Sequence, residues 1–503
     1  MTQRPLRSIV VVGGGTAGWM AAAALGKVVG TGRVRITLVE SEEIGTIGVG
    51  EATIPAILLF NRLLEIDEDA FVAATQATFK LGIEFVDWTR LGHRYFHNFG
   101  LLGAELRGGA AFSNYWLRWA SGSGADDPLR FSAETVAARG GRFGRAGGQD
   151  GLPSINYAFQ FDAAAYAAFL RDYAERRGVV RREGRVVEVE RGDAGIEAIR
   201  LADGGRVAGD FFVDCSGMRG LLIGALEGTD YDDWREWLPN DRAIAVPCER
   251  GETTTPFTRA TARGAGWQWR IPLQHRIGNG HVFSSPHMSD DEAAAILLGQ
   301  LDGAPLAEPR TIRFTTGRRR RSWVGNCLAV GLSSGFLEPL ESTSIHLVQA
   351  AIMKLLDYFP TRDSDPVLVD RFNDEMARLY EAIRDFLLAH YVVTERDDTA
   401  YWRGFRAMEL PDTLREKLAL FERRGEVLPK VGELFSETSW FAVLYGQGIR
   451  PVGWNPIADG LSDDQLALTM ARIGEAIDRR VAGLPPHDRF VAGCCAASPP
   501  AGR

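Results

Sequence analysis

The segment SIVVVGGGTAG, residues 8–18, decides the fold of this 503-residue chain. An apolar strand, 8–12, runs directly into three glycines, and an alanine-rich helix is predicted to about Val28. A second strand, Val34–Glu40, follows at the spacing of a βαβ unit. The arrangement predicts a parallel sheet whose first turn binds a dinucleotide.

The glycines of this turn have the spacing G-x-G-x-x-G, and each has a physical role. Gly13 permits a tight turn, Gly15 lets a pyrophosphate approach the backbone, and Gly18 lets the helix pack closely against the strand. The helix start offers unbonded N–H groups to an anion, and the acid that ends the second strand can accept hydrogen bonds from a ribose. The residues expected to contact the cofactor here are Gly13, Gly15, Thr16, Ala17, Gly18 and Glu40.

Two later segments, FFVDCSG at 211–217 and CLAVG at 327–331, are each an apolar strand that ends in a glycine turn. A long chain that returns two more strands to the same fold resembles the FAD-binding flavin hydroxylases. We therefore expect an α/β fold with a three-layer, flavin-monooxygenase-like core of the glutathione-reductase type. The chain has no second glycine fingerprint for NAD(P)H, so reducing equivalents are expected to arrive from elsewhere.

Composition narrows the class of protein. With 45% hydrophobic and 24% charged residues the chain is typical of soluble globular proteins. A net charge of −8 and a single basic run, 318–321, argue against a nucleic-acid partner. Five cysteines without CxxC or metal-type Cys/His spacing predict neither a disulfide framework nor a metal site. Since no apolar run reaches about 18 residues, we expect a cytoplasmic protein without membrane association.

The periodicity of apolar residues predicts the remaining organisation. A glycine-rich loop is expected at 139–151. Strands are expected at 185–189, 196–201, 211–215, 243–247, 266–273 and 281–285, and helices at 56–80, 342–359, 367–392, 411–424 and 463–483. As domains we expect a cofactor-binding core at 1–345 with a β-rich substrate segment at about 85–210 and 240–320, a helical region at 346–490 that completes the substrate pocket, and a frayed tail at 491–503.

The segment GLSSG, residues 331–335, matches the G-x-S-x-G turn of hydrolases. The chain has no HGGG-type oxyanion motif, and the main sheet is already assigned to a dinucleotide. A backbone turn that touches the flavin is therefore favoured over Ser333 as a nucleophile.

Four further motifs follow in order along the chain. The motifs are GVGEATIP at 48–55, FKLG at 79–82, GWQWRIP at 266–272 and FLEPLEST at 336–343. Taken alone, the two tryptophans of the third motif lie on one face of a strand and are typical of a sheet core. Lys80 at a helix end and Glu341 at a helix start likewise have ordinary electrostatic explanations. Together the four motifs resemble the flavin-dependent halogenases of the tryptophan halogenase family over roughly residues 8–345.

The resemblance implies an enzyme that uses FADH2, O2 and bromide or chloride. In the family, a flavin C4a-hydroperoxide is attacked by halide, and the resulting hypohalous acid is delivered to the position of Lys80, which forms a haloamine or polarises the acid. Glu341, supported by Ser342, would stabilise and deprotonate the cationic ring. Further residues assigned by the resemblance are Gly50, Glu51, Ala52 and Ile345 for the flavin, Thr343 and Ser344 for the halide, and His97, Phe99, Trp267 and Trp269 around the substrate.

Two departures from the family pattern concern the substrate and the halide. Members that halogenate free tryptophan generally carry glycine where this chain has Ser344, which puts halide affinity in question. They also bind the amino acid with a Tyr-Tyr pair and a nearby glutamate, whereas the matching stretch here is SWFAVLYGQ, residues 439–447. Because an ammonium without its carboxylate partner binds poorly, we expect an indole-type or other electron-rich ring that contacts Trp440 and Phe441. The chain looks closest to the branch that acts on free indole, which often favours bromide.

Two alternatives remain at this stage: a flavin-dependent aromatic monooxygenase, and a flavoprotein sensor or binding module without turnover. The expected partners are a separate NAD(P)H-dependent flavin reductase and a small aromatic substrate. The natural substrate, the ring position, the halide preference, the chemical role of Lys80 and the oligomeric state, with a homodimer among the options, stay open.

Overall fold

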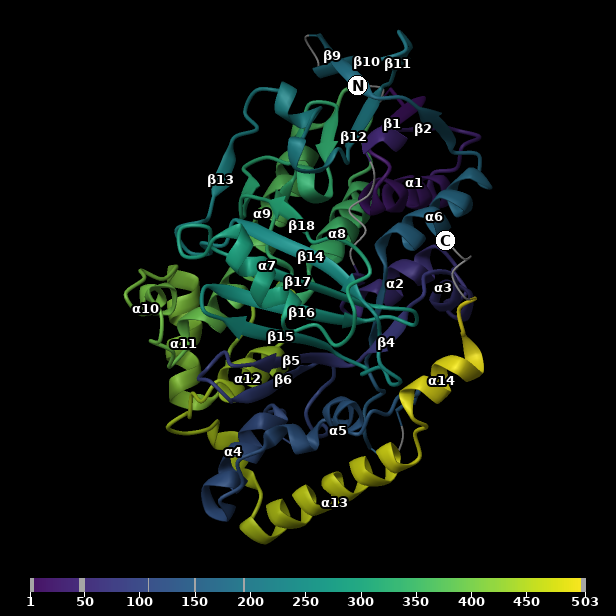
Figure 1. Ribbon diagram of the computed structural model, residues 1–503. Helices are drawn as coiled ribbons and strands as arrows, with labels where there is room; N and C mark the ends of the chain where they lie inside the picture. Colours follow the sequence, from purple (N-terminus) through teal and green to yellow (C-terminus); the bar gives the residue numbers. More distant parts are fainter. Residues whose placement is uncertain (1–3, 45–49, 107, 149–150, 193–194, 499–503) are drawn as a thin grey trace. The chain divides into compact units, whose positions relative to one another are not determined.

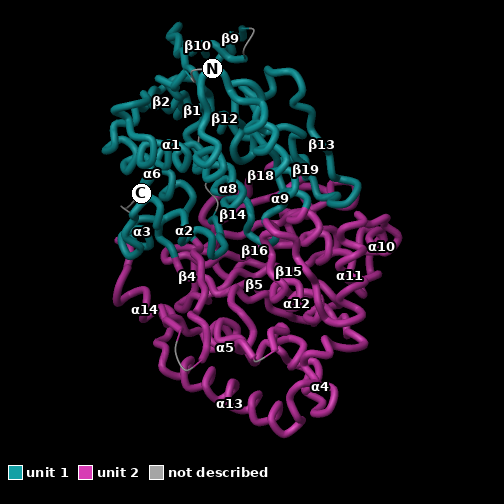
Figure 2. The backbone as a smooth tube through the Cα atoms, turned by 180° about the vertical axis from the view of Figure 1, so that it is seen from behind, with its two compact units in different colours: residues 1–77, 161–241, 313–381 teal, residues 78–160, 242–312, 382–503 magenta. Residues whose placement is uncertain are grey.

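The computed structural model describes residues 4–44, 50–106, 108–148, 151–192 and 195–498 (Figure 1). The chain divides into two compact units, each assembled from three separate segments (Figure 2). Unit 1 comprises 1–77, 161–241 and 313–381, and unit 2 comprises 78–160, 242–312 and 382–503.

The main sheet of unit 1 has six strands in the order β20-β21-β12-β1-β2-β8. β1 pairs in parallel with β2 on one side, where Ser8 lies opposite Arg35, and with β12 on the other. The strands are β1 (Ser8–Val12), β2 (Arg35–Glu40), β8 (Val180–Glu183), β12 (Phe211–Asp214), β20 (Trp323–Val324) and β21 (Cys327–Ala329). Both later segments expected to return to this sheet, 211–215 and 327–331, supply strands to it, and the carboxyl ends of β1, β12 and β21 lie at one edge because the three are parallel.

Unit 1 has the expected three layers. One layer is helical, with α1 (Thr16–Val28) packed on α6 (Ala163–Glu175) and α8 (Ser344–Asp357). Alanine favours helix formation, and its small side chain lets a helix pack closely on a sheet. Ala21 to Ala24 of α1 are fully buried. On the other side of the sheet, apolar residues of β1, β2, β12 and β21 share one core with the antiparallel sheet of β9 (Val186–Gly192), β10 (Gly195–Leu201) and β11 (Arg206–Ala208).

Shorter elements complete unit 1. They are β3 (Gly50–Ala52), α2 (Ala56–Leu63), α3 (Glu68–Ala74), the small sheet of β13 (Tyr231–Asp233), β19 (Gly317–Arg319) and β22 (Gly335–Phe336), and α9 (Pro366–Val392), within which the chain passes into unit 2.

Unit 2 is built on a seven-stranded sheet in the order β18-β14-β17-β16-β15-β5-β6. Its strands are β5 (Gly82–Val86), β6 (Arg94–Asn98), β14 (Arg242–Cys248), β15 (Thr258–Arg263), β16 (Gly266–Pro272), β17 (Ile277–Phe283) and β18 (Arg310–Arg313). In addition, β4 (Thr78–Lys80) pairs antiparallel with β7 (Ala158–Asp162).

The helices of unit 2 come mostly from the C-terminal third of the chain. They are α4 (Phe112–Ser123), α5 (Ala133–Arg139), α7 (Asp290–Leu298), α10 (Ala400–Arg406), α11 (Asp412–Arg424), α12 (Glu437–Gly446), α13 (Asp463–Ala482) and α14 (His487–Cys494). The segment expected to fray has contacts as far as Ala497, whose N–H donates to the Gln274 side chain over 2.8 Å. None of the helices within the described residues is long and apolar enough to cross a membrane.

The prediction of one helix over 56–80 is wrong. The chain forms α2, α3 and then β4, and the breaks fall at Glu65 and Gln76, which have φ values of 53° and 57°. A left-handed residue cannot continue a right-handed helix. Lys80 therefore ends a strand, and the helix-dipole explanation for it does not apply.

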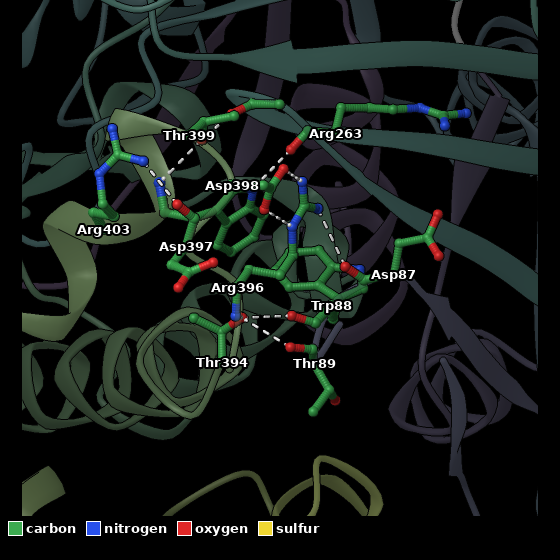
Figure 3. Close-up of polar contacts among 12 residues, drawn as sticks. Asp87, Trp88, Thr89, Arg263, Thr394, Arg396, Asp397, Asp398, Thr399 and Arg403 are labelled. Carbon is green, nitrogen blue, oxygen red and sulfur yellow. Dashed lines mark hydrogen bonds and ion pairs between the residues drawn. The ribbon is translucent and has the colours of Figure 1, made fainter. Parts of the chain in front are cut away.

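The segment between α9 and α10 forms polar contacts with the β15–β16 hairpin and with the chain after β5 (Figure 3). Arg396 binds the carboxylate of Asp398 through two nitrogens and donates to the carbonyl oxygen of Asp87. The hydroxyl of Thr399 donates to the carbonyl oxygen of Gly264 over 2.7 Å. The Thr399 hydroxyl thus bonds the turn of the hairpin that carries both tryptophans of the third motif to this segment of unit 2.

Candidate active site

The turn after β1 accepts only glycine at two of the three motif positions. A Cβ on Gly13, whose φ is 115°, would lie 2.2 Å from the carbonyl oxygen of Cys215, and one on Gly18 would lie 1.8 Å from that of Gly13. A Cβ on Gly15 would meet no atom within 4 Å, so the turn is open at that point. Gly15 caps α1 without any side-chain hydrogen bond, and the first turn of α1 has no acidic residue. These features fit a cofactor phosphate at the α1 N-terminus, beside Thr16 and Ala17.

Glu40, at the end of β2, lies across this turn. A Cβ on Gly14 would come within 1.4 Å of its carboxylate. The carboxylate forms an ion pair with Arg181 of β8, which also binds Glu42 and Glu183. The arginine fixes the acid at the edge where a dinucleotide ribose is expected, so the residues present fit FAD.

The ends of β12 and β21 are joined through Asp214. Its carboxylate accepts hydrogen bonds from the N–H groups of Ser216, Leu222 and Ile223, and the N–H of Val330 donates to its carbonyl oxygen. The hydroxyl of Ser333 donates to the carbonyl oxygens of Asp214 and Val330. Ser333 is therefore part of this backbone turn, as favoured above over a nucleophilic serine.

The first of the four motifs, GVGEATIP, begins with Gly48 and Val49, which lie outside the described residues. β3 follows and includes Gly50, Glu51 and Ala52. Burial raises the pKa of the Glu51 carboxyl to about 7. Ile345, also expected at the flavin, is buried in the first turn of α8.

Glu341, Ser342 and Thr343 form a buried, irregular link before α8. Glu341 ends a short 3₁₀ turn, Pro339–Glu341, and does not begin a helix as expected, because Ser342 has a left-handed φ of 58°. Such a conformation costs a non-glycine residue of order 1–3 kcal/mol and is typical of functional sites. Thr343 caps α8 without using its side chain, and its buried hydroxyl has no hydrogen-bond partner among the residues that the structure describes. Ser344 is half-buried at the first position of α8.

His346 lies one residue beyond Ile345 and is not among the site residues predicted from the sequence. Burial lowers its pKa to about 4, and its Nδ1 has no hydrogen-bond partner in the described part of the chain. A neutral imidazole one helical turn after Thr343, with its Nδ1 unpartnered among the described residues, adds a polar group to this end of α8. The signal available in the sequence was a histidine in an otherwise apolar run, ILV, after Ser344.

Lys80 of unit 2 is fully buried at the end of β4. Its backbone pairs with Ala158 of β7, and its Nζ lies 4.9 Å from the centre of the Phe99 ring. An ammonium in this position is attracted by the face of the ring. The structure thus brings together two residues assigned to the site, Lys80 and Phe99.

His97 of β6 belongs to a second set of aromatic rings in unit 2. Its ring lies 5.5 Å from Phe386 and 6.1 Å from Phe435. Phe386 stacks on Phe435 at 3.7 Å and meets the Trp440 ring edge-on at 4.8 Å. Since Phe99 lies 6.4 Å from His97, these rings link Lys80 to Trp440. Phe386 and Phe435 were not identified from the sequence, because they are distant from every motif.

Trp440 and Phe441 point to different sides of α12. Phe441 stacks on Tyr445 at 5.3 Å and contacts Trp116 and Phe421 instead of the His97 rings. Gln447, seven residues after Trp440, lies on the same side of the helix as Trp440. Within the described chain, neither polar atom of the buried Gln447 amide nor the Trp440 Nε1 has a hydrogen-bond partner. One turn before Trp440, burial and Glu426 raise the pKa of Glu437 to about 7.

Trp267 and Trp269 lie on the same face of β16, with their ring centres 6.1 Å apart. Trp267 packs into the sheet core against Trp88 at 6.5 Å. Trp269 covers Gly280 of β17, where a Cβ would lie 2.0 Å from its indole ring. Its Nε1 is buried and has no hydrogen-bond partner among the described residues.

The family model of tryptophan halogenases matches residues 8–463 of this chain. The chain belongs to the tryptophan halogenase family. It is 37% identical to tryptophan 6-halogenase SttH of Streptomyces toxytricini, over 91% of this chain and 93% of that protein. Among solved structures, Xcc4156, a flavin-dependent halogenase from Xanthomonas campestris, is similar with a TM-score of 0.95 at 47% identity, over 99% of this chain and 100% of that one. BrvH, a flavin-dependent halogenase from Brevundimonas sp. BAL3, has a TM-score of 0.93 at 45% identity, over 97% and 99%.

This member of the tryptophan halogenase family is therefore an enzyme, a flavin-dependent halogenase. Flavin-dependent halogenases take FADH2, halide and O2, and they generally rely on a separate flavin reductase. The resemblance noted from the four motifs is confirmed over nearly the whole chain, including the helical C-terminal part.

Proposed function

We propose that this halogenase installs bromine or chlorine on an electron-rich aromatic ring such as indole, and that its substrate lacks an amino-acid head group. Lys80 passes the halogen to the ring, and Glu341 accepts the proton that the ring loses. The observation that carries the proposal is the fully buried Lys80 ammonium above the Phe99 ring, because a buried lysine among aromatic rings suits transfer of an electrophile to an aromatic carbon.

Gly13, Gly15, Thr16, Ala17, Gly18 and Glu40 would hold FAD, with Gly50, Glu51, Ala52 and Ile345 as further contacts. Bound in its reduced form, FAD would activate O2, and the oxidising equivalents of O2 would convert the halide to hypohalous acid. The halide would bind near the Thr343 hydroxyl, which has no hydrogen-bond partner within the described chain, and near the start of α8 at Ser344, where backbone N–H groups favour an anion.

Lys80 either hydrogen-bonds hypohalous acid through its Nζ or takes the halogen as a haloamine, since an ammonium is a donor and a desolvated amine is a nucleophile. Glu341 then stabilises the cationic ring and accepts its proton, as a positioned carboxylate can. Ser342 beside it has a strained left-handed backbone, and such strain is typical of residues held in place at functional sites. Trp267 and Trp269 would keep the organic substrate apart from the cofactor.

The substrate class is inferred from the face of α12 that bears Trp440. Gln447 on this face is neutral, and the stretch 439–447 has no carboxylate for an ammonium group. The Glu437 carboxyl one turn earlier ionises less readily than an ordinary glutamate, because burial and Glu426 raise its pKa to about 7. His97, Phe99 and Trp440 offer ring faces and edges to a planar aromatic substrate. Phe441 faces another side of α12 and would not contact the substrate ring directly.

The proposal is tested by steady-state kinetics with indole and with free tryptophan, each with FAD, a flavin reductase, NADH and bromide. We expect the Michaelis constant for tryptophan to exceed that for indole by about tenfold or more, which corresponds to about 1.4 kcal/mol for an unpaired head group. A Michaelis constant for tryptophan equal to or below that for indole would overturn the substrate class.

A flavin-dependent aromatic monooxygenase is the second candidate function, since it shares the fold and the cofactor. It predicts a hydroxylated product that does not depend on halide. The buried pair of Lys80 and Phe99 favours the halogenase, because hydroxylation has no use for the lysine.

A further inference from the structure

The strand that carries Lys80 is held from two sides. On one side β4 pairs with β7, with Phe79 opposite Phe159 and Lys80 opposite Ala158. On the other side the backbone N–H of Phe79 donates to Nε2 of His487, over 3.2 Å. His487 begins α14, 408 residues later in the sequence. A side chain from the end of the chain thus takes the place of a strand at this edge of β4.

The contacts of His487 fix its protonation. Its Nδ1 lies 3.2 Å from the carbonyl oxygen of Thr254 and 3.2 Å from the hydroxyl of the same residue. Because Nε2 accepts from Phe79, the ring proton must reside on Nδ1, where it can be donated to that carbonyl oxygen. His487 is 1% exposed, and burial lowers its pKa. The ring is therefore neutral in the arrangement that holds β4.

The surroundings of this hydrogen bond are apolar or charge-balanced. Phe143 stacks on the Phe79 ring at 4.1 Å, and Phe490 of α14 meets it edge-on at 5.4 Å. The charged groups nearby are Asp488, which accepts from the Thr254 hydroxyl, and Arg145, which lies 5.4 Å from both the Phe79 and the Phe490 rings. Beyond the lysine, the N–H of residue 81 donates to the carbonyl oxygen of Pro256 over 2.8 Å.

We infer that His487 is a positioning residue for Lys80, and that its neutral imidazole holds the backbone of β4 so that the lysine stays above Phe99. The inference rests on the proposed role of Lys80. Protonation of His487 turns Nε2 from an acceptor into a donor, and the Phe79 N–H then loses its partner. β4 is released on that side, and oxidising equivalents are lost from halogenation while flavin oxidation continues.

The test compares His487→Leu, which removes the acceptor, with His487→Gln, whose amide oxygen can accept near the former Nε2. Val491→Ala, in the same helix, controls for general loosening of α14. Each enzyme is assayed with FAD, a reductase, NADH, bromide and indole for brominated product per NADH consumed, and the exchange of backbone amide hydrogens in residues 78–81 is followed by mass spectrometry. A displacement of about 1 Å at a reacting group can cost about 100-fold in rate.

We expect His487→Leu to lower bromination by about tenfold or more, with NADH consumption unchanged and faster amide exchange at 78–81. His487→Gln restores both, and its product yield per NADH no longer falls at acidic pH as it does in the wild type. Equal exchange and equal yield in the Leu and Gln variants would overturn the inference. If Lys80→Ala still brominates, the proposed function fails instead. Amide exchange at residues 78–81 still reports whether His487 holds the backbone of β4. If His487→Leu does not fold, the pH profile and exchange of His487→Gln against wild type decide.

Discussion

The Nζ of Lys417 in α11 lies 5.2 Å from the centre of the Trp440 ring in α12. Lys417 is buried and forms an ion pair with Glu433 at 2.8 Å. The cation on one side and the edge-on Phe386 ring on another fix the indole of Trp440. The position of Trp440 beside the His97 rings therefore depends on a charge pair that does not itself belong to those rings.

Replacing Lys417 by Met should lower the free energy of unfolding by about 3 kcal/mol, because the Glu433 carboxylate is left nearly buried without a partner. The double variant Lys417→Met with Glu433→Gln should regain most of this loss. Urea denaturation followed by tryptophan fluorescence measures both. Equal stability of the single and double variants would mean that the pair does not balance a buried charge.

Replacing Gln447 by Glu should shift the substrate preference toward free tryptophan. A carboxylate on the Trp440 side of α12 can pair with the substrate ammonium, and we expect the ratio of kcat/KM for tryptophan to that for indole to rise by about tenfold. Competition of the two substrates, with products separated by mass spectrometry, gives this ratio directly. Gln447→Leu is the matched control, and an unchanged ratio in the Glu variant would place Gln447 away from the substrate.

Replacing Lys80 by Ala should abolish halogenated product, while NADH is still consumed through the added reductase. The amine is the only group assigned to pass the halogen to the ring, so its loss should cost at least about 100-fold in product formation. Peroxide release should account for the NADH consumed. Halogenation at the wild-type rate in this variant would remove Lys80 from the mechanism.

Glu51 should make the stability of the cofactor-free enzyme depend on pH. Its pKa is raised from 4.5 to about 7 in the folded state, so the folded state holds a proton that the unfolded state has lost between these values. The stabilisation is complete below about pH 4.5 and is lost as the pH rises through 7. Glu51→Gln should therefore be more stable than the wild type at pH 8, by roughly 1–3 kcal/mol. The free energy of unfolding is measured for both proteins at several pH values from 5 to 8. The same pH dependence in both proteins would contradict the prediction.

The cofactor turn could be predicted from the sequence because most of its determinants are local. Gly18 is required by the carbonyl oxygen of Gly13 in the same turn, and Gly13 by its φ of 115° as well as by the distant carbonyl oxygen of Cys215. The strands returning at 211–215 and 327–331 end in glycine turns of their own. Lys80 was identified by its motif, but its strand was not, since the breaks at Glu65 and Gln76 depend on left-handed backbone that ordinary residues seldom adopt.

The contacts around the site residues were less predictable. Trp440 and Phe441 are adjacent aromatic residues that the sequence does not distinguish. Only the packing of α12 shows that Trp440 contacts Phe386 and that Phe441 contacts Trp116. Lys417 is 23 residues from Trp440, and His487 is 408 residues from Phe79. No periodicity or motif connects such pairs, because the contacts arise from tertiary packing.

The most direct test of the whole account is one aerobic reaction of the enzyme with FAD, a flavin reductase, NADH and indole, run with bromide, with chloride and without halide. Products are identified by mass spectrometry. We predict a product with the isotope doublet of bromine or chlorine that requires both the enzyme and the halide. An oxygenated product of the same yield in all three reactions would contradict halogenation and identify a monooxygenase.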